Sequence, residues 1–326
     1  MSKNKVQFQK GMSLTDFMAQ YGDEQQCRSF VFQARWPKGF CCPECGYEKY
    51  CEIRNRNCFQ CNRCHYQTSL LSGTIYEQTK LPLSKWFLAS YLLTQNKNGL
   101  SALTLSRQLG VSYNTAWSVK HKLMQVMLER ERSQPLSGRV EMDDAYWGGE
   151  KQGGKRGRGS ENKTPFVAAV ETTEEGQPVR MKMHKVKGFR KEEIKHWGQQ
   201  QLEKDSHVVT DGLWAFKGLQ DAGIKHEAIV TGGGRKSVEL LAFHWINTLL
   251  GNVKSAMQGT YHAIQSKHLP RYLAEFEYRF NRRFKLDAIV TRLVHASVRT
   301  PPMPGRRCGD HFQKRLRAIN RSEEDL

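Results

Sequence analysis

The chain contains the stretches Arg139-Val-Glu-Met-Asp143 and His207-Val-Val-Thr-Asp211, and these two stretches decide its expected fold. Each holds a run of apolar or β-branched residues, which is typical of a buried strand, and each ends in an aspartate. We expect each strand to present its last residue at the edge of a sheet. The two carboxylates can then converge on a divalent cation.

A third polar group is expected from a helix further along the chain. The stretch 238–257 has a helical pattern, and within it Asn247, Gly251 and Lys254 recur at positions i, i+4 and i+7. Residues at this spacing share one face of a helix, so an amide, a gap and a cation would point toward the same pocket. Carboxylate and amide oxygens suit a divalent cation, and the set indicates a metal-dependent phosphoryl-transfer site.

The order of predicted elements between residues 136 and 300 indicates an α/β domain. Three strands are expected first, and then helices and strands alternate; the ranges are 139–147, 165–171 and 179–186 for the strands, then helix 189–204, strand 206–211, helix 213–222, strand 226–230 and helix 237–257. Such an order implies a mixed sheet with flanking helices. This succession matches the ribonuclease H-like fold.

A cluster of cysteines precedes this domain. Eight of the nine cysteines fall between Cys27 and Cys64, which suits a metal site in a reducing compartment better than a disulfide framework. Cys42-Pro-Glu-Cys45 and Cys61-Asn-Arg-Cys64 have the spacing of a zinc ribbon, in which four thiolates bind one structural Zn²⁺. We expect the ribbon over 41–80, after an N-terminal helical segment over 1–40.

The choice of zinc ligands stays open between two registers. Cys41, Cys51 and Cys58 lie near the four thiolates, and Cys58-x2-Cys61 offers an alternative pair. Turn-forming residues favour one set, because Gly46 and Arg63-Cys64-His65 supply knuckle-like turns. We therefore predict the ligands to be Cys42, Cys45, Cys61 and Cys64.

Residues 81–135 are expected to form a helix-turn-helix domain. Gly110 permits a sharp turn, Ser112 caps a second helix, and an apolar stripe is formed by Leu103, Leu109, Val111, Ala116, Trp117, Val119 and Leu123. The second helix would present polar and basic residues to a DNA groove, namely Tyr113, Asn114, Ser118, Lys120, His121 and Lys122. An ordinary helical hairpin is the alternative.

The formal net charge of +19 indicates a polyanionic partner, for which nucleic acid is the first choice. Basic residues gather in the glycine-rich loop 148–164, which holds Lys151, Lys155, Arg156, Arg158 and Lys163. Arginines at 279, 282 and 283 are interleaved with aromatic residues and could follow a DNA backbone. A charged tail is expected over 301–326. The apolar runs are far too short to span a bilayer, so no membrane partner is expected.

With these features in order, the chain resembles a bacterial insertion-sequence transposase of the IS1595 family, with an ISXO2-like DDE domain. The resemblance covers most of the chain. It is carried by the two CxxC pairs and by Ser72-Gly-Thr-Ile75, Leu81-Pro-Leu-Ser-Lys-Trp86, Val140-Glu-Met-Asp143-Asp-Ala-Tyr-Trp-Gly-Gly149, Asp211-Gly212, His244-Trp-Ile-Asn247, Lys254 and Tyr272-Leu-Ala-Glu-Phe-Glu-Tyr-Arg-Phe-Asn-Arg-Arg283.

The resemblance implies an enzyme that uses two Mg²⁺ or Mn²⁺ ions held by Asp143, Asp211 and Asn247, with Lys254 at the DNA end. Asp144 is a further candidate, since Asp143-Asp144 replaces the usual Asp-Glu pair of the family, and His244 and His262 are secondary candidates. The implied partner is double-stranded DNA, both the terminal inverted repeats of the element and its target. A homo-oligomer on DNA, in the bacterial cytoplasm with the nucleoid, is the corresponding expectation.

Two other functions stay open from the sequence. A non-catalytic DNA-binding regulator would use only the zinc ribbon and the helix-turn-helix. A ribonuclease H-like nuclease or resolvase would share the metal site but would hydrolyse DNA without joining it. Two strand-end aspartates argue against the regulator, which would have no use for them together.

Overall fold

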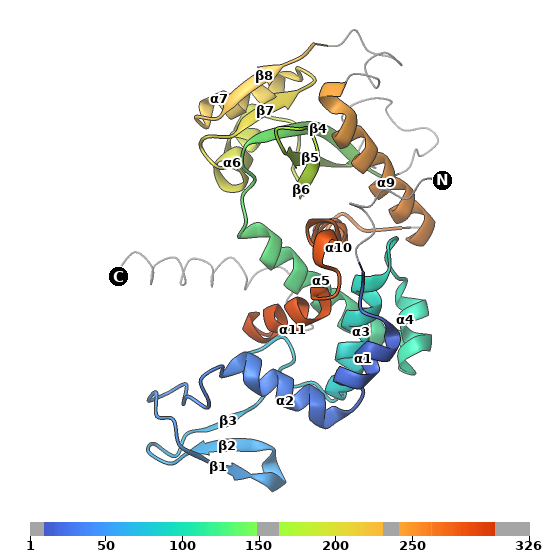
Figure 1. Cartoon of the computed structure of the whole chain (residues 1–326). Helices are drawn as coiled ribbons and strands as arrows, with labels where there is room; N and C mark the ends of the chain where they lie inside the picture. The colour runs from blue at the N-terminus through green and yellow to red at the C-terminus, as the bar shows by residue number, and fades with distance from the viewer. Residues whose placement is uncertain (1–9, 149–162, 231–240, 262, 304–326) are drawn as a thin grey trace. The chain divides into compact units, whose positions relative to one another are not determined.

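A computed structural model describes residues 10–148, 163–230, 241–261 and 263–303 of the chain (Figure 1). The chain divides into two compact units. The first comprises Met1–Met12, Leu92–Leu105 and Met127–Ile289, and the second comprises Ser13–Tyr91, Ser106–Val126 and Val290–Leu326. The division into five segments expected from the sequence remains a prediction.

The first unit is built on a five-stranded mixed sheet in the order β6-β5-β4-β7-β8. The strands are β4 (Arg139–Trp147), β5 (Thr164–Thr172), β6 (Pro178–Lys185), β7 (His207–Thr210) and β8 (Lys225–Ala228). The first three pair antiparallel, and β4, β7 and β8 pair parallel. This is the mixed, ribonuclease H-like sheet that the sequence predicts.

Helices cover both faces of this sheet (Figure 1). Alternate residues of β4 separate the two cores: Val140 and Met142 pack with α6 (Lys191–Gln201) and α7 (Gly218–Asp221), whereas Ala145 and Trp147 pack on the opposite face with α9 (His244–Thr260) and α10 (Leu269–Asn281). The period of two along the strand therefore decides which residues face α9.

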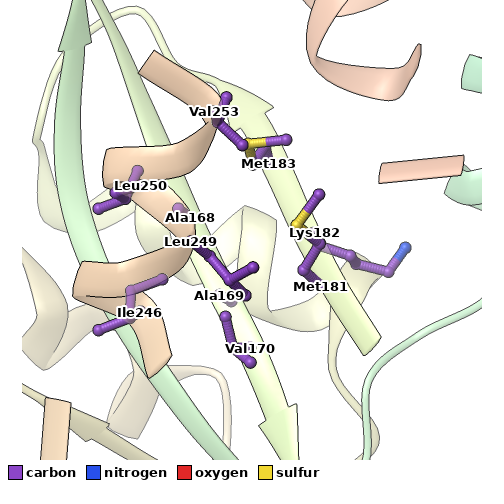
Figure 2. A pocket seen from close by; sticks show the side chains of 10 residues that line it. All are labelled: Ala168, Ala169, Val170, Met181, Lys182, Met183, Ile246, Leu249, Leu250 and Val253. Carbon is purple, nitrogen blue, oxygen red and sulfur yellow. The ribbon is translucent and has the colours of Figure 1, made fainter. Parts of the chain in front are cut away.

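Helix α9 packs closely on strands β5 and β6. Its buried residues Ile246, Leu249, Leu250 and Val253 lie against Ala168, Val170, Met181 and Met183 (Figure 2). These side chains recur at helical spacing, so one apolar stripe fixes the rotation of the helix about its axis. The neighbouring residues Asn247 and Lys254, which directly follow Ile246 and Val253, are consequently held at fixed positions along the helix.

Two predicted helices differ from the structure. The stretch 213–222 forms a 3₁₀ turn at Trp214–Lys217 before the short α7, and the start of the last predicted helix, 237–240, lies outside the described residues. A 3₁₀ turn at Leu241–Phe243 precedes α9, which continues to Thr260. Gly218 lies so close to α6 that a Cβ atom there would be 2.2 Å from the carbonyl oxygen of Lys191. This approach requires a glycine.

The arginines of α10 were expected on a DNA-facing surface, and this expectation is wrong for Arg279 and Arg282. Both are buried: Arg279 donates to Glu275 at 2.6 Å, and Arg282 pairs with Glu131 of α5 (Tyr113–Arg132). Arg283 donates to the carbonyl of Val179 at 2.9 Å. The guanidinium groups satisfy buried acceptors inside the unit, because a buried charge requires a partner.

The second unit begins with two capped helices and a three-stranded ribbon. Helices α1 (Leu14–Tyr21) and α2 (Glu24–Arg35) each start with a capping box. The ribbon strands are β1 (Tyr50–Ile53), β2 (Cys58–Cys61) and β3 (Gln67–Ser69), paired antiparallel. The end of α2 packs on the ribbon through an aromatic cluster formed by Phe32, Trp36, Phe40, Tyr50 and Phe59.

The remaining helices are α3 (Leu83–Gln95), α4 (Ala102–Leu109), α5 and α11 (Ile289–Arg299). Gly110 has φ +60°, and the Ser112 hydroxyl accepts the Thr115 N–H at 3.2 Å, as expected for a turn followed by a capped helix. In the described part of the chain, no helix is both long enough and apolar enough to cross a membrane.

Candidate functional site

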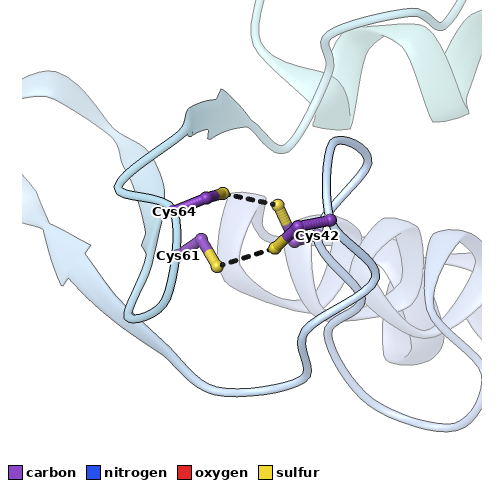
Figure 3. Close-up of side chains that lie close together, drawn as sticks. Cys42, Cys61 and Cys64 are labelled. Atoms are coloured by element: carbon purple, nitrogen blue, oxygen red, sulfur yellow. Dashed lines mark hydrogen bonds between the residues drawn. The ribbon is translucent and has the colours of Figure 1, made fainter.

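Four cysteines converge at one end of the ribbon. The Sγ atoms of Cys42 and Cys64 lie 3.6 Å apart, as do those of Cys45 and Cys61 (Figure 3). Thiolates at about 2.3 Å from a tetrahedral zinc ion would be about 3.8 Å from one another, so the group fits Zn²⁺. Among the described residues, Cys41, Cys51 and Cys58 are not part of this group.

Two similar turns bring these cysteines together. The N–H of Gly46 donates to the carbonyl of Cys42 at 2.9 Å, and the N–H of His65 donates to that of Cys61 at 3.1 Å. Gly46 and His65 both have left-handed backbone, with φ of +70° and +58°. Gly46 and His65, which favoured this set of zinc ligands in the sequence, thus form the two turns that hold the cysteines.

The parallel pairing of β4 with β7 brings two aspartates side by side. Met142 pairs with Thr210 at the end of the ladder, so the next residues of the two strands are Asp143 and Asp211. Carboxylate oxygens of Asp143, Asp144 and Asp211 all lie within 4.8 Å of one another. Asp143 was predicted at the end of its strand; it is instead in the middle of β4, opposite Ala168, where the shorter β7 stops.

The chain beyond Asp211 turns away from the sheet. Gly212 has φ +86°, and the side chain of Asp211 accepts the N–H of Leu213 at 3.1 Å. The turn directs the following residues away and leaves the carboxylate at the carboxyl end of β7. Ligand sites in open α/β sheets form at such strand ends.

The three carboxylates repel one another. Burial raises the pKa of Asp143 to about 6, and the nearby charges of Asp144 and Asp211 add to this effect. The N–H of Asp144, which donates to Asp143 at 2.8 Å, and the positive charge of Lys254 act in the opposite direction. A set of three carboxylate oxygens that destabilise one another is a suitable donor set for Mg²⁺ or Mn²⁺.

The predicted helical residues lie on α9. Asn247 and Lys254 are half-buried, seven residues apart, and therefore on the same face of the helix. The positive charge of Lys254 lowers the pKa of Asp143, against the larger effect of burial. His244 is exposed at the first position of α9, with its ring 4.9 Å from that of Trp245. Asp144 belongs to the acidic cluster, and His262 lies outside the described residues.

One residue of the site was missed from the sequence. Glu141 was treated as part of an ordinary strand run, but its side chain is only 1% exposed and contacts the start of α9. A charged residue inside an otherwise apolar strand, two positions before Asp143, was the available signal. Such a residue faces the same side of the sheet as Asp143.

The predicted DNA-facing residues of α5 divide into two groups. Tyr113, Asn114 and Ser118 are exposed. Lys120 is only 1% exposed, so its predicted contact with DNA is wrong. His121 is equally buried, with its ring stacked 3.8 Å from that of Trp117.

Lys122 is also held inside the second unit. Its ammonium donates to the carbonyl of Ile75 at 3.4 Å and lies 5.8 Å from the centre of the Trp86 ring, and burial lowers its pKa. Lys122 is nevertheless only half-buried, so its predicted contact with DNA remains a prediction. The middle of α5 is buried on nearly all sides, so its exposed residues lie in the first turns of the helix and at its end, at Arg130 and Arg132. The loop residues Lys155, Arg156 and Arg158 lie outside the described part of the chain.

Two family models match the chain. Residues 135–281 match the ISXO2-like transposase domain, and residues 22–67 match the transposase zinc-ribbon domain. A curated relative is described as an uncharacterized protein in transposable element ISH50 of Halobacterium salinarum. It is 28% identical over 230 residues, which cover 65% of this chain and 75% of the relative.

Solved structures of Mos1 transposase show a weak similarity. The Mos1 mariner paired-end complex with Mn matches 60% of this chain and 76% of that chain, with 11% identity and a TM-score of 0.21. The Mos1 paired-end complex with the left transposon end matches 64% and 80%, also with 11% identity and a TM-score of 0.21. The fold assignment rests on the strand order of the sheet.

The first prediction concerns the zinc ligands. Cys42→Ser and Cys61→Ser should each lose the single bound Zn²⁺, because three thiolates cannot close the site and the small ribbon needs the metal to fold. Cys58→Ser is the matched control, and it should keep one zinc per chain. Zinc would be measured colorimetrically after thiol modification of the purified protein. Loss of zinc from Cys58→Ser would show that the alternative register, in which Cys58 pairs with Cys61, is the correct one.

The second prediction concerns the acidic cluster. Without divalent cation, Asp143→Asn should stabilise the protein by roughly 1 kcal/mol, because a partly screened repulsion between carboxylates is removed. Mn²⁺ should raise the melting temperature of the unaltered protein and leave that of Asp143→Asn unchanged.

The melting measurements would use metal-depleted buffer without chelator, so that the ribbon keeps its zinc. Asp205→Asn, in an exposed turn, is the control and should behave like the unaltered protein. An equal Mn²⁺ response in Asp143→Asn would contradict a cation site at this carboxylate.

Proposed function

Because the chain belongs to the IS1595 family of insertion-sequence transposases, we propose that its acidic cluster cuts DNA at the ends of the element and joins them to target DNA. The family implies polynucleotidyl transfer. The observation that supports this site most directly is the convergence of Asp143, Asp144 and Asp211 within 4.8 Å. A regulator that only binds DNA would have no use for this repulsive arrangement.

The side chains around the cluster have distinct roles in the proposal. Asp143 would contact both cations, and Asp211 would hold one of them. Asn247 would offer its carbonyl oxygen as a neutral ligand from α9. Helix α9 supplies an amide and not a carboxylate. Asp144 therefore supplies the third carboxylate of the site. Bound Mg²⁺ or Mn²⁺ would supply positive charge for the attacking and leaving oxygens of an in-line displacement.

Lys254 would orient the DNA end. Its positive charge lowers the pKa of Asp143, which supports a role for this lysine in attracting a phosphate beside the cluster. The charge of Lys254 offsets part of the repulsion between the acidic cluster and a phosphodiester. This lets a polyanion approach a site that is itself acidic.

The helix-turn-helix would contact DNA through the start of α5. Its exposed residues Tyr113, Asn114 and Ser118 carry no charge, so they suit contacts with base edges rather than with phosphates. The basic loop with Lys155, Arg156 and Arg158 would add phosphate contacts. Two element ends must be held together for transposition, so the working form would be a homo-oligomer on DNA.

The proposed activity is tested by cleavage of DNA. With Mg²⁺ or Mn²⁺, the unaltered protein should nick a duplex that carries the ends of its element, and Asp211→Asn and Asn247→Ala should each lose this activity while still binding the duplex. Asp205→Asn is the control and should cleave normally. A gel assay for nicking, together with a gel-shift assay for binding, separates the two properties. Normal cleavage by Asp211→Asn would refute the assignment.

A glycine on α9 tests whether DNA approaches this face of the helix. A Cβ atom at Gly251 or at Gly259 would meet no atom within 4 Å, so alanine at either position should stabilise the helix by about 0.5–1 kcal/mol. Gly251 lies between Asn247 and Lys254, whereas Gly259 lies near the end of the helix.

If a phosphodiester occupies the space beside Asn247 and Lys254, Gly251→Ala should cleave DNA at least several-fold more slowly although it melts at a higher temperature. Gly259→Ala should gain stability and keep normal cleavage. Equal cleavage by the two variants would place the DNA away from this face.

A further inference from the structure

Helix α9 begins without a capping residue of its own. The residue before it is Phe243, which has no side-chain acceptor for the free N–H groups of the first turn. Such groups need an acceptor when the helix end is buried. A carboxylate from strand β4 supplies it: one oxygen of Glu141 accepts the N–H of Trp245 and that of Ile246, each at 3.1 Å.

A second residue of β4 fixes this carboxylate. Arg139 donates to the other oxygen of Glu141 at 3.0 Å, to the hydroxyl of Thr172 at 3.3 Å and to the carbonyl of Ala242 at 3.4 Å. The chain is therefore held on both sides of the point where α9 begins. A buried anion at the positive end of the helix adds a favourable interaction with the helix dipole.

The contact between Glu141 and the start of α9 lies close to the proposed catalytic residues along both β4 and α9. Glu141 and Asp143 are two residues apart on the same face of β4, which is roughly 7 Å. Asn247 follows Ile246 directly, so it is about 1.5 Å further along the helix axis than the last anchored residue. A shift of α9 by a single residue would therefore change the position of Asn247 relative to Asp143 on β4.

We propose that Glu141 is a positioning residue, whose buried carboxylate sets the register of α9 on β4 and so holds Asn247 beside the acidic cluster. This inference rests on the proposed function of that cluster. Glu141 acts through Asn247 and touches neither cation nor DNA. Its removal should weaken cation binding even where the fold persists, since loss of an outer partner typically costs roughly 10- to 100-fold in metal affinity.

Four variants of the full-length protein test the inference. Glu141→Ala removes the acceptor, and Glu141→Gln keeps one oxygen that can accept both N–H groups. Glu171→Gln is the matched control: Glu171 is a half-buried carboxylate of the same sheet that accepts a backbone N–H, from Ser137 at 3.1 Å, but it does not contact α9. The fourth variant is the double change of Glu141→Ala with Asn247→Ala, and its reference is the single change Asn247→Ala that also tests the proposed function.

Two measurements would be made well below the melting temperature of each variant. Hydrogen exchange at the amides of Trp245 and Ile246 reports the anchoring of the helix, and Mn²⁺ titration reports the site. Glu141→Ala should exchange faster at both amides and bind Mn²⁺ roughly tenfold more weakly or worse. Glu141→Gln should recover much of both properties, and Glu171→Gln should match the unaltered protein.

The double variant decides the route by which Glu141 acts. If Glu141 works through Asn247, then Glu141→Ala should cause no further loss of Mn²⁺ affinity once Asn247 is alanine. A second tenfold loss in that background would overturn the inference. Unchanged Mn²⁺ affinity in Glu141→Ala, with faster exchange at the two amides, would overturn it as well.

The outcomes also separate this inference from the proposed function. If the unaltered protein neither binds Mn²⁺ nor cleaves DNA, the proposed function fails and the inference fails with it. If the unaltered protein does both and Glu141→Ala does so equally well, only the inference fails.

Discussion

The parallel pairing of β4 with β7 is the constraint on which the rest of the site depends. Its last pair, Met142 with Thr210, leaves Asp143 and Asp211 as neighbours on adjacent strands. Backbone hydrogen bonds and two apolar cores hold these strands in register, and a slip by one residue would turn every side chain of the slipped strand to the opposite face. The sheet can therefore hold like charges together that would separate on a flexible loop.

The third element of the site is positioned by side chains rather than by the sheet ladder. Helix α9 lies on the sheet through its apolar stripe, which fixes its rotation, while Glu141 and Arg139 fix where it begins. Apolar contacts alone resist sliding weakly, because aliphatic side chains can repack at modest cost. Directional hydrogen bonds to a buried carboxylate supply the missing specificity along the axis.

The sequence predicted the strands, the zinc ribbon and the convergence of Asp143 with Asp211, because each depends on local patterns or on one regular spacing. The exposure of charged residues was predicted less well. Lys120 has the spacing of a DNA-facing residue on α5, yet neighbouring parts of the unit cover it. The periodicity of apolar residues predicts the exposed face of a helix that packs on one side. It fails for a helix that is buried on nearly all sides. For the same reason, the burial of Glu141 could not be seen from its strand alone.

The buried arginines at the end of α10 and directly after it change which part of the chain carries the positive charge. They leave the net charge itself unchanged. Arg279 is matched by Glu275 and Arg282 by Glu131, so each buried pair removes one positive and one negative charge from the surface. The net charge of +19 therefore remains on the rest of the chain. A polyanion would be attracted by this excess, whereas its position on the protein would be decided by the few groups that act on the cluster, of which Lys254 is one. The net charge indicates that the partner is a polyanion. The local geometry of the acidic cluster and of α9 would determine which phosphate reacts.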